Sequence, residues 1–176
     1  VTLKNPNGVV IDAVAYTTSS YGNSNKSEGG WALERINPNQ PCLGASNWIA
    51  STNPIGGTPS QANSVLQTTP DQQAPVAIRA FPTANNQVRL FFDESVSVQN
   101  SQNAANYSIT GGVSVSNISA ESPFFNTLLL NLSSDLQTNR VYTIRFANGF
   151  TDCVGNPIAG STEVKVALPK PILAGD

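Results

Sequence analysis

The chain has 176 residues and a mass of 18.5 kDa, which is enough for one domain or two small ones. Only 11% of the residues are charged, and the net charge of −2 disfavours non-specific binding to nucleic acid or to an anionic membrane surface. The chain contains no His, which excludes Ser-His-Asp, Cys-His and His-metal sites built within it. It also lacks an apolar run of about 18 residues, so we expect no membrane insertion in this segment.

Uncharged polar residues take the place of the missing charges. Asn, Ser, Thr and Gln make up 62 of the 176 residues, and 13 Gly and 12 Pro add turn-forming positions. This composition is typical of loop-rich β proteins rather than of helical ones. The sequence also contains no Met, and we therefore expect it to be a processed or excised piece of a longer polypeptide.

Residues 1–16 carry the pattern of a β-hairpin. Pro6-Asn7-Gly8 is a turn signal between two β-rich runs, and Gly8 supplies the positive φ that such a turn needs. The second run places Val10, Asp12, Val14 and Tyr16 on one face, with period two. A polar loop over 17–30, a short strand over 31–36 and a second loop over 37–48 are expected to follow. Residues 54–75 are interpreted as a loop and then a linker.

Seven short runs rich in β-branched and aromatic residues follow residue 74. They recur at spacings of about 8–15 residues with turn residues between them, which is typical of an antiparallel β-sandwich. Single helical turns are expected over 102–105 and 134–136, and the Pro-containing tail is expected to be a linker. The runs are PVAIRAFP, QVRLFFD, NYSITG, VSVSNIS, NTLLLNL, RVYTIRFA and STEVKVALP.

Three separated motifs within residues 1–66 appear in the order found in lamin-tail domains, which this part of the chain resembles. The resemblance implies the C-terminal portion of an Ig-like sandwich over 1–68, with the opening strands missing; residues 172–176 resemble the lead-in to such an opening strand. Ser60 stands where the family usually has Gly. The motifs are Leu33-Glu34-Arg35, Asn47-Trp48 and Gly56-Gly57-Thr58-Pro59-Ser60-Gln61-Ala62-Asn63, together with the upstream hairpin LKNPNGVVIDAVAY.

A second ordered set of motifs resembles a bacterial Ig-like domain of the kind found in surface-layer proteins. We therefore expect an all-β chain of two Ig-like antiparallel β-sandwiches in tandem, the first of them incomplete. The predicted boundaries are a linker over 69–74, the second domain over 75–168 and a linker or tail over 169–176. The motifs are Asp71-x-x-Ala74-Pro75, Val88-x-Leu-Phe-Phe-Asp93-Glu94-x-Val96, Ala104-x-Asn106-Tyr107-x-Ile109, Leu136 with Tyr142, and Asp152-Cys153-x-Gly155-Asn156.

Candidate metal ligands and the cysteines have structural alternatives. Asp93, Asp152 and Asn156 are weak calcium candidates, but capping of turns by the Asp side chains is the favoured interpretation, and we expect no cofactor. Cys42 and Cys153 lie in different predicted domains, and we expect no disulfide between them. The alternatives are a bridge that pins the two domains together, a partner upstream of this sequence, or buried free thiols.

We expect no catalytic residues. Glu28 and Glu34 are the only nearby carboxylate pair, and Glu34 and Arg35 are better explained as structural strand residues. Trp31 and Trp48 are expected in the core rather than stacked on a sugar.

Other aromatic residues are assigned by their place between strands. The resemblance implies that Tyr142 is the tyrosine corner of an Ig-like fold. Phe124 and Phe125 in a predicted loop, with Tyr21, form a possible contact surface.

The expected function is a non-catalytic structural or adhesive module of a secreted or cell-surface bacterial protein. The expected partners are a protein or glycan at the cell surface, and either the missing lamin-tail strands or a partner chain next to residues 1–4. No nucleic acid is expected, because the chain lacks a basic patch. The alternative is a ligand-binding or accessory module of an outer-membrane or extracellular complex, or of an enzyme.

Overall fold

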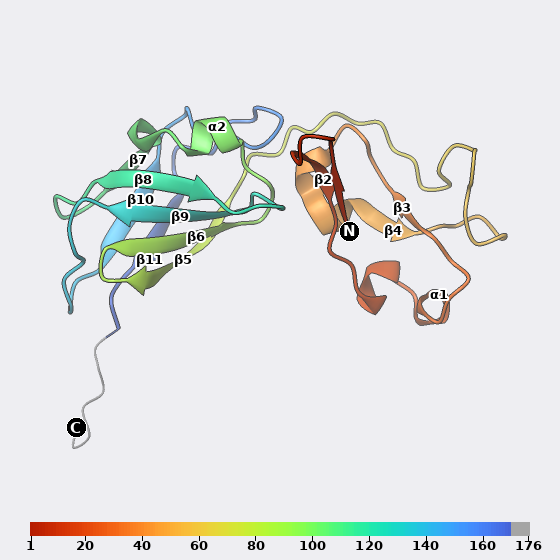
Figure 1. Ribbon diagram of the computed structural model, residues 1–176, viewed down its shortest axis with the longest axis horizontal. Coiled ribbons are helices and arrows are strands. Elements are labelled where there is room, and N and C mark those ends of the chain that lie inside the picture. Colours follow the sequence, from red (N-terminus) through yellow and green to blue (C-terminus); the bar gives the residue numbers. More distant parts are fainter. Residues whose placement is uncertain (170–176) are drawn as a thin grey trace, which may run out of the picture. The chain divides into compact units, whose positions relative to one another are not determined.

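The computed structural model describes residues 1–169 and divides the chain into two compact units, Val1–Gln72 (unit 1) and Gln73–Asp176 (unit 2). Short antiparallel strands joined by loops build both units (Figure 1). The predicted all-β class is therefore confirmed. Within residues 1–169, no helix combines the length and the apolar composition needed to cross a membrane. The predicted tail lies outside the described residues except for residue 169.

Unit 1 contains two separate two-stranded antiparallel sheets. The hairpin predicted over 1–16 is confirmed by the pairing of β1 with β2, and Gly8 in its turn has φ +80°. The second sheet pairs β3, the strand predicted over 31–36, with β4. Three short helices lie in the connections. The bounds are β1 Thr2–Lys4, β2 Val10–Ala13, 3-10 helix η1 Thr18–Tyr21, α1 Ser24–Ser27, β3 Leu33–Arg35, 3-10 helix η2 Pro41–Asn47 and β4 Trp48–Ala50.

Unit 1 has almost no apolar core. Among residues 1–72, all of which the structure describes, Cys42 and Ala50 are the only buried apolar side chains. The other buried side chains are polar, and many large apolar ones are exposed. A two-stranded sheet is marginally stable by itself, so polar contacts must carry much of the stability of this unit. The buried polar residues are Glu34, Asn37, Asn47 and Ser51, and the large exposed apolar ones are Val1, Leu3, Val9, Ile11, Tyr16, Ile49, Ile55 and Leu66.

Unit 2 is a sandwich of a four-stranded sheet, in the order β5-β6-β9-β8, and a three-stranded sheet, in the order β11-β10-β7 (Figure 1). Named A to G along the chain, these strands have the orders ABED and GFC, which is the constant-type Ig topology. All seven predicted strands are confirmed. The bounds are β5 Ala77–Ala84, β6 Gln87–Phe92, β7 Tyr107–Ile109, β8 Val115–Ala120, β9 Thr127–Leu132, β10 Tyr142–Phe146 and β11 Glu163–Val166.

The core of unit 2 follows from strict alternation along its central strands. On β6 the side chains of Val88, Leu90 and Phe92 are buried, whereas those between them are half-buried. Strand β9 repeats the pattern with leucines at 128, 130 and 132. Because successive side chains of a strand point to opposite faces, this pattern sends one apolar row from each strand between the sheets.

Aromatic rings fill one part of this core. Phe92 stacks on Phe150 at a centroid distance of 5.0 Å, and Phe146 contacts Phe150 edge-on at 5.1 Å. Tyr107 packs edge-on against the same cluster, and its hydroxyl donates a hydrogen bond to the carbonyl oxygen of Ser101. Burial raises the pKa of the Tyr107 phenol far above its ordinary value of 10.0.

The helical turns of unit 2 differ in part from those expected. Helix α2 spans Val98–Ser101, before the turn expected over 102–105, and the 3-10 helix η3 spans Ala104–Asn106 and overlaps only the second half of that turn. Ser97 and Asn103 cap them by accepting hydrogen bonds from backbone N–H groups. Residues 134–136 form no helix, which corrects the second expected turn.

Truncation of Leu128 should destabilise unit 2, because this side chain is fully buried. We expect Leu128→Ala to lower the free energy of unfolding by about 2–5 kcal/mol. The adjacent Leu129→Ala is the matched control, because Leu129 lies half-buried on the opposite face of β9. Urea unfolding followed by circular dichroism measures both changes. An equal loss in the two variants would contradict the assigned register.

Candidate functional site

Several polar contacts of unit 1 meet at the carboxylate of Glu34, in the centre of β3. This side chain is only 5% exposed. One oxygen accepts a hydrogen bond from the Thr58 hydroxyl at 2.5 Å, and the other accepts bonds from the backbone N–H and hydroxyl of Ser64, both at 2.8 Å. The carboxylate therefore fastens the loop over residues 51–64 to the β3–β4 sheet.

These hydrogen bonds keep the buried carboxylate ionised. Burial alone would raise the pKa of the Glu34 carboxyl, but hydrogen bonds from Thr58, Ser64 and Ser51 together lower that pKa below its ordinary value of 4.5. A charged acceptor strengthens each of these bonds. With both oxygens engaged by neutral donors, Glu34 is placed as a structural anion rather than as a proton-transfer group.

The glycine motif allows the same loop to approach closely. Gly56 has φ +90°, and a Cβ at this position would lie 2.0 Å from the carbonyl oxygen of Gly30. Its own carbonyl oxygen accepts a hydrogen bond from the Ala32 N–H at 2.7 Å. Ser60, four residues further on, also lies in the left-handed region at φ +61°, which glycine adopts without strain.

Two buried asparagines close the other end of β3. The amide oxygen of Asn47 accepts a hydrogen bond from the backbone N–H of Asn37, and its amide nitrogen donates back to the Asn37 carbonyl oxygen at 2.7 Å. The Asn37 side chain donates to the backbone and the hydroxyl of Thr69. These amides take the place that apolar contacts occupy in an ordinary core.

Arg35 joins the two sheets of unit 1. Its Nη1 lies 2.9 Å from the Asp12 carboxylate on β2, and its carbonyl oxygen accepts a hydrogen bond from the Asn63 side chain. Both partners of the ion pair are partly exposed, so the pair contributes at most about 1 kcal/mol. Glu28, the other member of the carboxylate pair considered above, is exposed in the loop after α1.

The tryptophans are not core residues, which corrects the expectation for both. Trp31 and Trp48 are half-buried. The Lys26 ammonium lies 4.3 Å from the centroid of a Trp31 ring and donates a hydrogen bond to the Ser51 carbonyl oxygen. Unit 1 lacks a second apolar layer against which the indoles could be buried.

The possible contact residues are only partly accessible. Tyr21 and Phe125 are half-buried, and Phe124 is 37% exposed. Backbone groups tie down the Phe loop, because the Phe124 carbonyl oxygen accepts from the Ser95 hydroxyl and the Phe125 N–H donates to Glu121.

Asp152 caps a turn, and the structure brings it together with Asn156 but not into a shared turn with Asp93. One Asp152 oxygen accepts hydrogen bonds from the N–H groups of residues 154, 155 and 156, and the other accepts from the Asn156 side chain at 2.7 Å. The Asp93 carboxylate instead accepts from the Val76 N–H, just before β5. Asp152 therefore caps a turn, and Asp93 caps a strand end.

Tyr142 opens β10, the F strand, and is buried. Its hydroxyl accepts a hydrogen bond from the backbone N–H of Gln137, five residues upstream, at 2.9 Å. This bond holds the loop that enters β10.

Both cysteines are disulfide-bonded, and neither Cys42 nor Cys153 is a free thiol. The expectation of no disulfide is therefore wrong. It rested on the assignment of the two residues to different domains, whereas disulfide formation depends on the approach of the Cβ atoms to about 4 Å, which a sequence does not specify.

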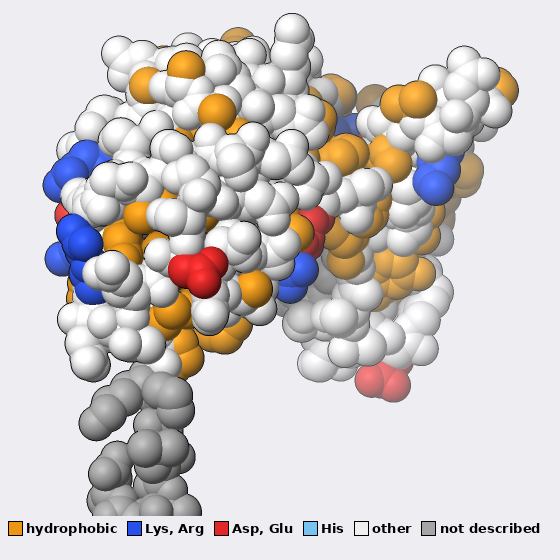
Figure 2. Space-filling model, turned by 60° about the vertical axis from the view of Figure 1, so that its left-hand side comes forward, with side chains coloured by type: hydrophobic (Ala, Val, Ile, Leu, Met, Phe, Trp, Pro, Cys, Tyr) orange, Lys and Arg blue, Asp and Glu red, His pale blue; other side chains and the backbone are white. Residues whose placement is uncertain are grey.

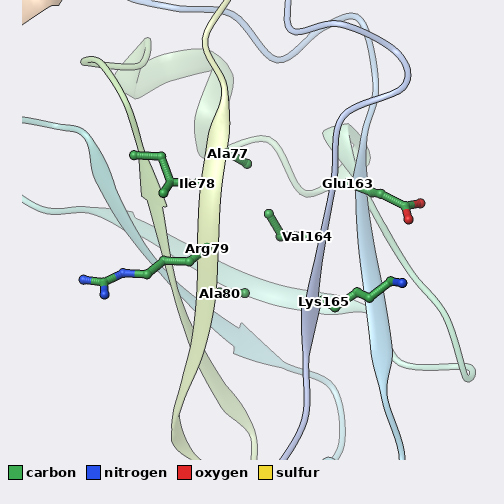
Figure 3. A pocket seen from close by; sticks show the side chains of 7 residues that line it. All are labelled: Ala77, Ile78, Arg79, Ala80, Glu163, Val164 and Lys165. Atoms are coloured by element: carbon green, nitrogen blue, oxygen red, sulfur yellow. The ribbon is translucent and has the colours of Figure 1, made fainter.

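The edges of the two sheets of unit 2 border a shallow cavity of about 370 Å³ between β5 and β11. Figure 3 shows Ala77, Ala80 and Val164 directed into it, whereas Arg79 points away from β11 and Lys165 points away from β5. The β5 edge is irregular, with bulges near both ends and Pro82 within it. Bulges and proline protect an edge strand from pairing with another chain.

The outer face of the four-stranded sheet holds residues that the sequence reasoning missed. Phe81 is 61% exposed and pairs across the strands with Arg89. Arg79 pairs with Phe91, and its guanidinium carbon lies 4.2 Å from the Phe91 ring centroid. The alternation within QVRLFFD could have revealed this face, since burial of Val88, Leu90 and Phe92 leaves Arg89 and Phe91 outside.

The ABED/GFC sandwich, with turn caps at its strand ends, defines a structural module of the immunoglobulin-like class. Residues 59–166 match the family described as Bacterial Ig-like domain, and the chain belongs to this family. A comparison with curated proteins finds no significant match.

Two solved structures share the fold. They are the S-layer protein rSbsC(31-844), at 17% identity, and the N-terminal part of the bacterial S-layer protein SbsC, at 18% identity, both with a TM-score of 0.51. Each match covers 57% of this chain and only 14% or 24% of the other chain. At these identities the likeness shows the fold alone.

Removal of the Glu34 anion should destabilise unit 1. We expect Glu34→Ala to lower its free energy of unfolding by about 1–3 kcal/mol, because the partly buried donors of Thr58 and Ser64 lose a charged acceptor. Because the folded pKa lies below the unfolded value, the contribution is present above about pH 4.5 and is lost as the pH falls through the folded pKa. Trp fluorescence reports on unit 1, since both tryptophans lie there.

Two variants control this experiment. Glu34→Gln should remove the acid-induced part of the stability change, because the amide does not titrate in this range. Glu28→Gln, at an exposed position, should leave both the stability and its pH dependence unchanged. An acid profile of Glu34→Gln identical to that of the unsubstituted chain would contradict the role of the anion.

Replacing Ser60 by a residue that adopts a positive φ without strain should stabilise unit 1. We expect Ser60→Gly to raise the free energy of unfolding by up to about 1 kcal/mol, because Gly removes the Cβ that this φ disfavours. Ser60→Ala, which keeps the Cβ, should give no gain. Urea unfolding followed by Trp fluorescence measures both variants, and a gain for Ala equal to that for Gly would refute the backbone explanation.

Proposed function

We propose that the chain is a non-catalytic structural and adhesive module of a longer, multidomain protein at the bacterial cell surface. The observation that carries this proposal is the seven-stranded sandwich of unit 2 within the matched bacterial Ig-like family. The two similar structures are S-layer proteins by name, and this supports a surface setting for the present chain.

The chemistry of the chain supports an extracellular location. Both cysteines are disulfide-bonded, and disulfides persist mainly in oxidising compartments. Polar bonds in unit 1 run largely through neutral Asn, Ser and Thr side chains, which do not titrate as the external pH changes. Low charge also limits non-specific attraction to other surface polymers.

Unit 1 is proposed to be the C-terminal portion of a lamin-tail domain. Two features support this assignment. Residues of its motifs are hydrogen-bonded to one another, Thr58 to the Glu34 carboxylate and Asn63 to the Arg35 carbonyl oxygen, and Ser60 has the backbone conformation of the Gly that the family usually has there.

The proposed partner of unit 1 is the missing set of lamin-tail strands or a partner chain, next to residues 1–4. All three residues of β1 are exposed, and the hairpin carries Leu3, Val9 and Ile11 into solvent. An added strand would pair with an open edge and cover apolar surface that unit 1 leaves exposed.

Antibodies raised against residues 1–176 should label intact cells of the source bacterium. The protein captured by these antibodies should have an intact mass well above 18.5 kDa, because the proposal makes this chain part of a longer polypeptide. An antibody against a cytoplasmic enzyme provides the control for cell integrity. Labelling only after permeabilisation would refute the surface location, and a captured mass of 18.5 kDa would refute the longer polypeptide.

A further inference from the structure

An aromatic ring flanked by two cations lies on the outer face of the four-stranded sheet. Phe81 projects from β5 with 61% of its surface exposed. Arg89 is directly opposite on β6, where paired side chains have Cβ atoms about 5 Å apart. Arg79 precedes Phe81 by two residues on the same face, so it lies about 7 Å along the strand.

Only one of these two arginines has an ion-pair partner among the described residues. Arg89 Nη2 lies 2.9 Å from the Glu121 carboxylate, and both side chains are more than one third exposed. Arg79 makes no ion pair with any described residue, and its planar group lies over Phe91 instead. The Phe91 contact holds the Arg79 guanidinium on the sheet, which lowers the entropy that it loses on binding a ligand.

The cations beside Phe81 are Arg79 and Arg89. Glu121 is paired with Arg89, and the exposed Asp93 at the end of β6 accepts a hydrogen bond from the Val76 N–H. Figure 2 shows one side of the molecule, on which Lys, Arg, Asp and Glu groups are scattered among hydrophobic areas, uncharged polar side chains and backbone. Charge complementarity therefore favours an anionic ligand at Phe81.

The geometry favours a saccharide over a peptide. An extended peptide would bind most readily by pairing with the free β5 edge, but two bulges and Pro82 interrupt that edge. The remaining surface is an open sheet face with one prominent ring. The negative face of a Phe ring attracts the polarised C–H groups on one side of a sugar ring. A guanidinium forms paired hydrogen bonds with a carboxylate.

We propose that this face binds an acidic polysaccharide with uronic-acid residues. Phe81 stacks against one sugar ring, and Arg79 and Arg89 bind carboxylates on either side of it. The inference deepens the adhesive role proposed above by naming the class of ligand. Binding measured with the purified chain does not depend on where the protein resides, so the two proposals fail separately.

Titration of the purified full chain with polygalacturonate tests the inference. We expect Phe81→Ala and Arg79→Gln each to raise the dissociation constant about tenfold or more. Raising NaCl from about 0.05 M to about 0.3 M should weaken binding, because screening reduces the attraction of exposed charges. Fully methyl-esterified polygalacturonate keeps the sugar ring without the charge and should bind at least about tenfold more weakly.

Matched variants in unit 2 provide the controls. Arg145→Gln removes an exposed arginine that is paired with Glu163, and Val141→Ala shortens an apolar side chain that is as exposed as Phe81, at 61%. Both should bind polygalacturonate within about twofold of the unsubstituted chain. Circular dichroism should show that all four variants remain folded, since none of these side chains belongs to the buried core.

Three outcomes would overturn the proposal. The first is absence of binding to polygalacturonate, and the second is equal binding of the esterified polymer. The third is a weaker affinity of Arg79→Gln with an unchanged affinity of Phe81→Ala, together with binding of poly-glutamate as tight as that of polygalacturonate. That pattern would mean that the face attracts any polyanion and that no sugar ring stacks on it.

Discussion

The buried carboxylate of Glu34 is the interaction on which unit 1 depends. A charge in a protein interior is tolerated only when hydrogen bonds replace its water shell, and Thr58 and Ser64 provide that replacement. The requirement fixes the path of the loop over 51–64, and the close approach of that loop requires Gly56 beside Gly30. The glycine motif and the path of this loop are thus tied to one buried anion.

The two units reach stability by different physical means. Unit 2 buries alternating rows of Val, Leu, Ile and Phe between its sheets, in the ordinary manner of a sandwich. Unit 1 buries Asn, Ser and Glu side chains and leaves its large apolar residues exposed or half-buried. Such a polar interior specifies geometry well but excludes little apolar surface from water, and an added strand would correct that deficit.

Unit 2 presents one protected edge and one open face. Pro82 and the bulges of β5 limit pairing of this edge with strands of other chains or domains. The outer face beside that edge carries the exposed Phe81, with Arg89 across from it on β6 and Arg79 two residues along β5. A structural module can therefore offer a specific contact without exposing an edge to aggregation.

The sequence by itself determined the strands and the class. Period-two alternation and turn residues located the hairpin at Gly8 and all seven strands of unit 2, because these signals are local. Tertiary structure decided which groups meet. The sequence did not reveal that Glu34 would bond to Ser64, since the two are 30 residues apart. The prediction that Trp48 lies in a core failed because unit 1 forms almost no apolar core. The prediction for the cysteines failed because it relied on domain assignment, whereas a disulfide depends on the distance between the two side chains. The sequence also passed over Phe81 and Arg79, because an exposed surface is defined by what packs on the opposite face.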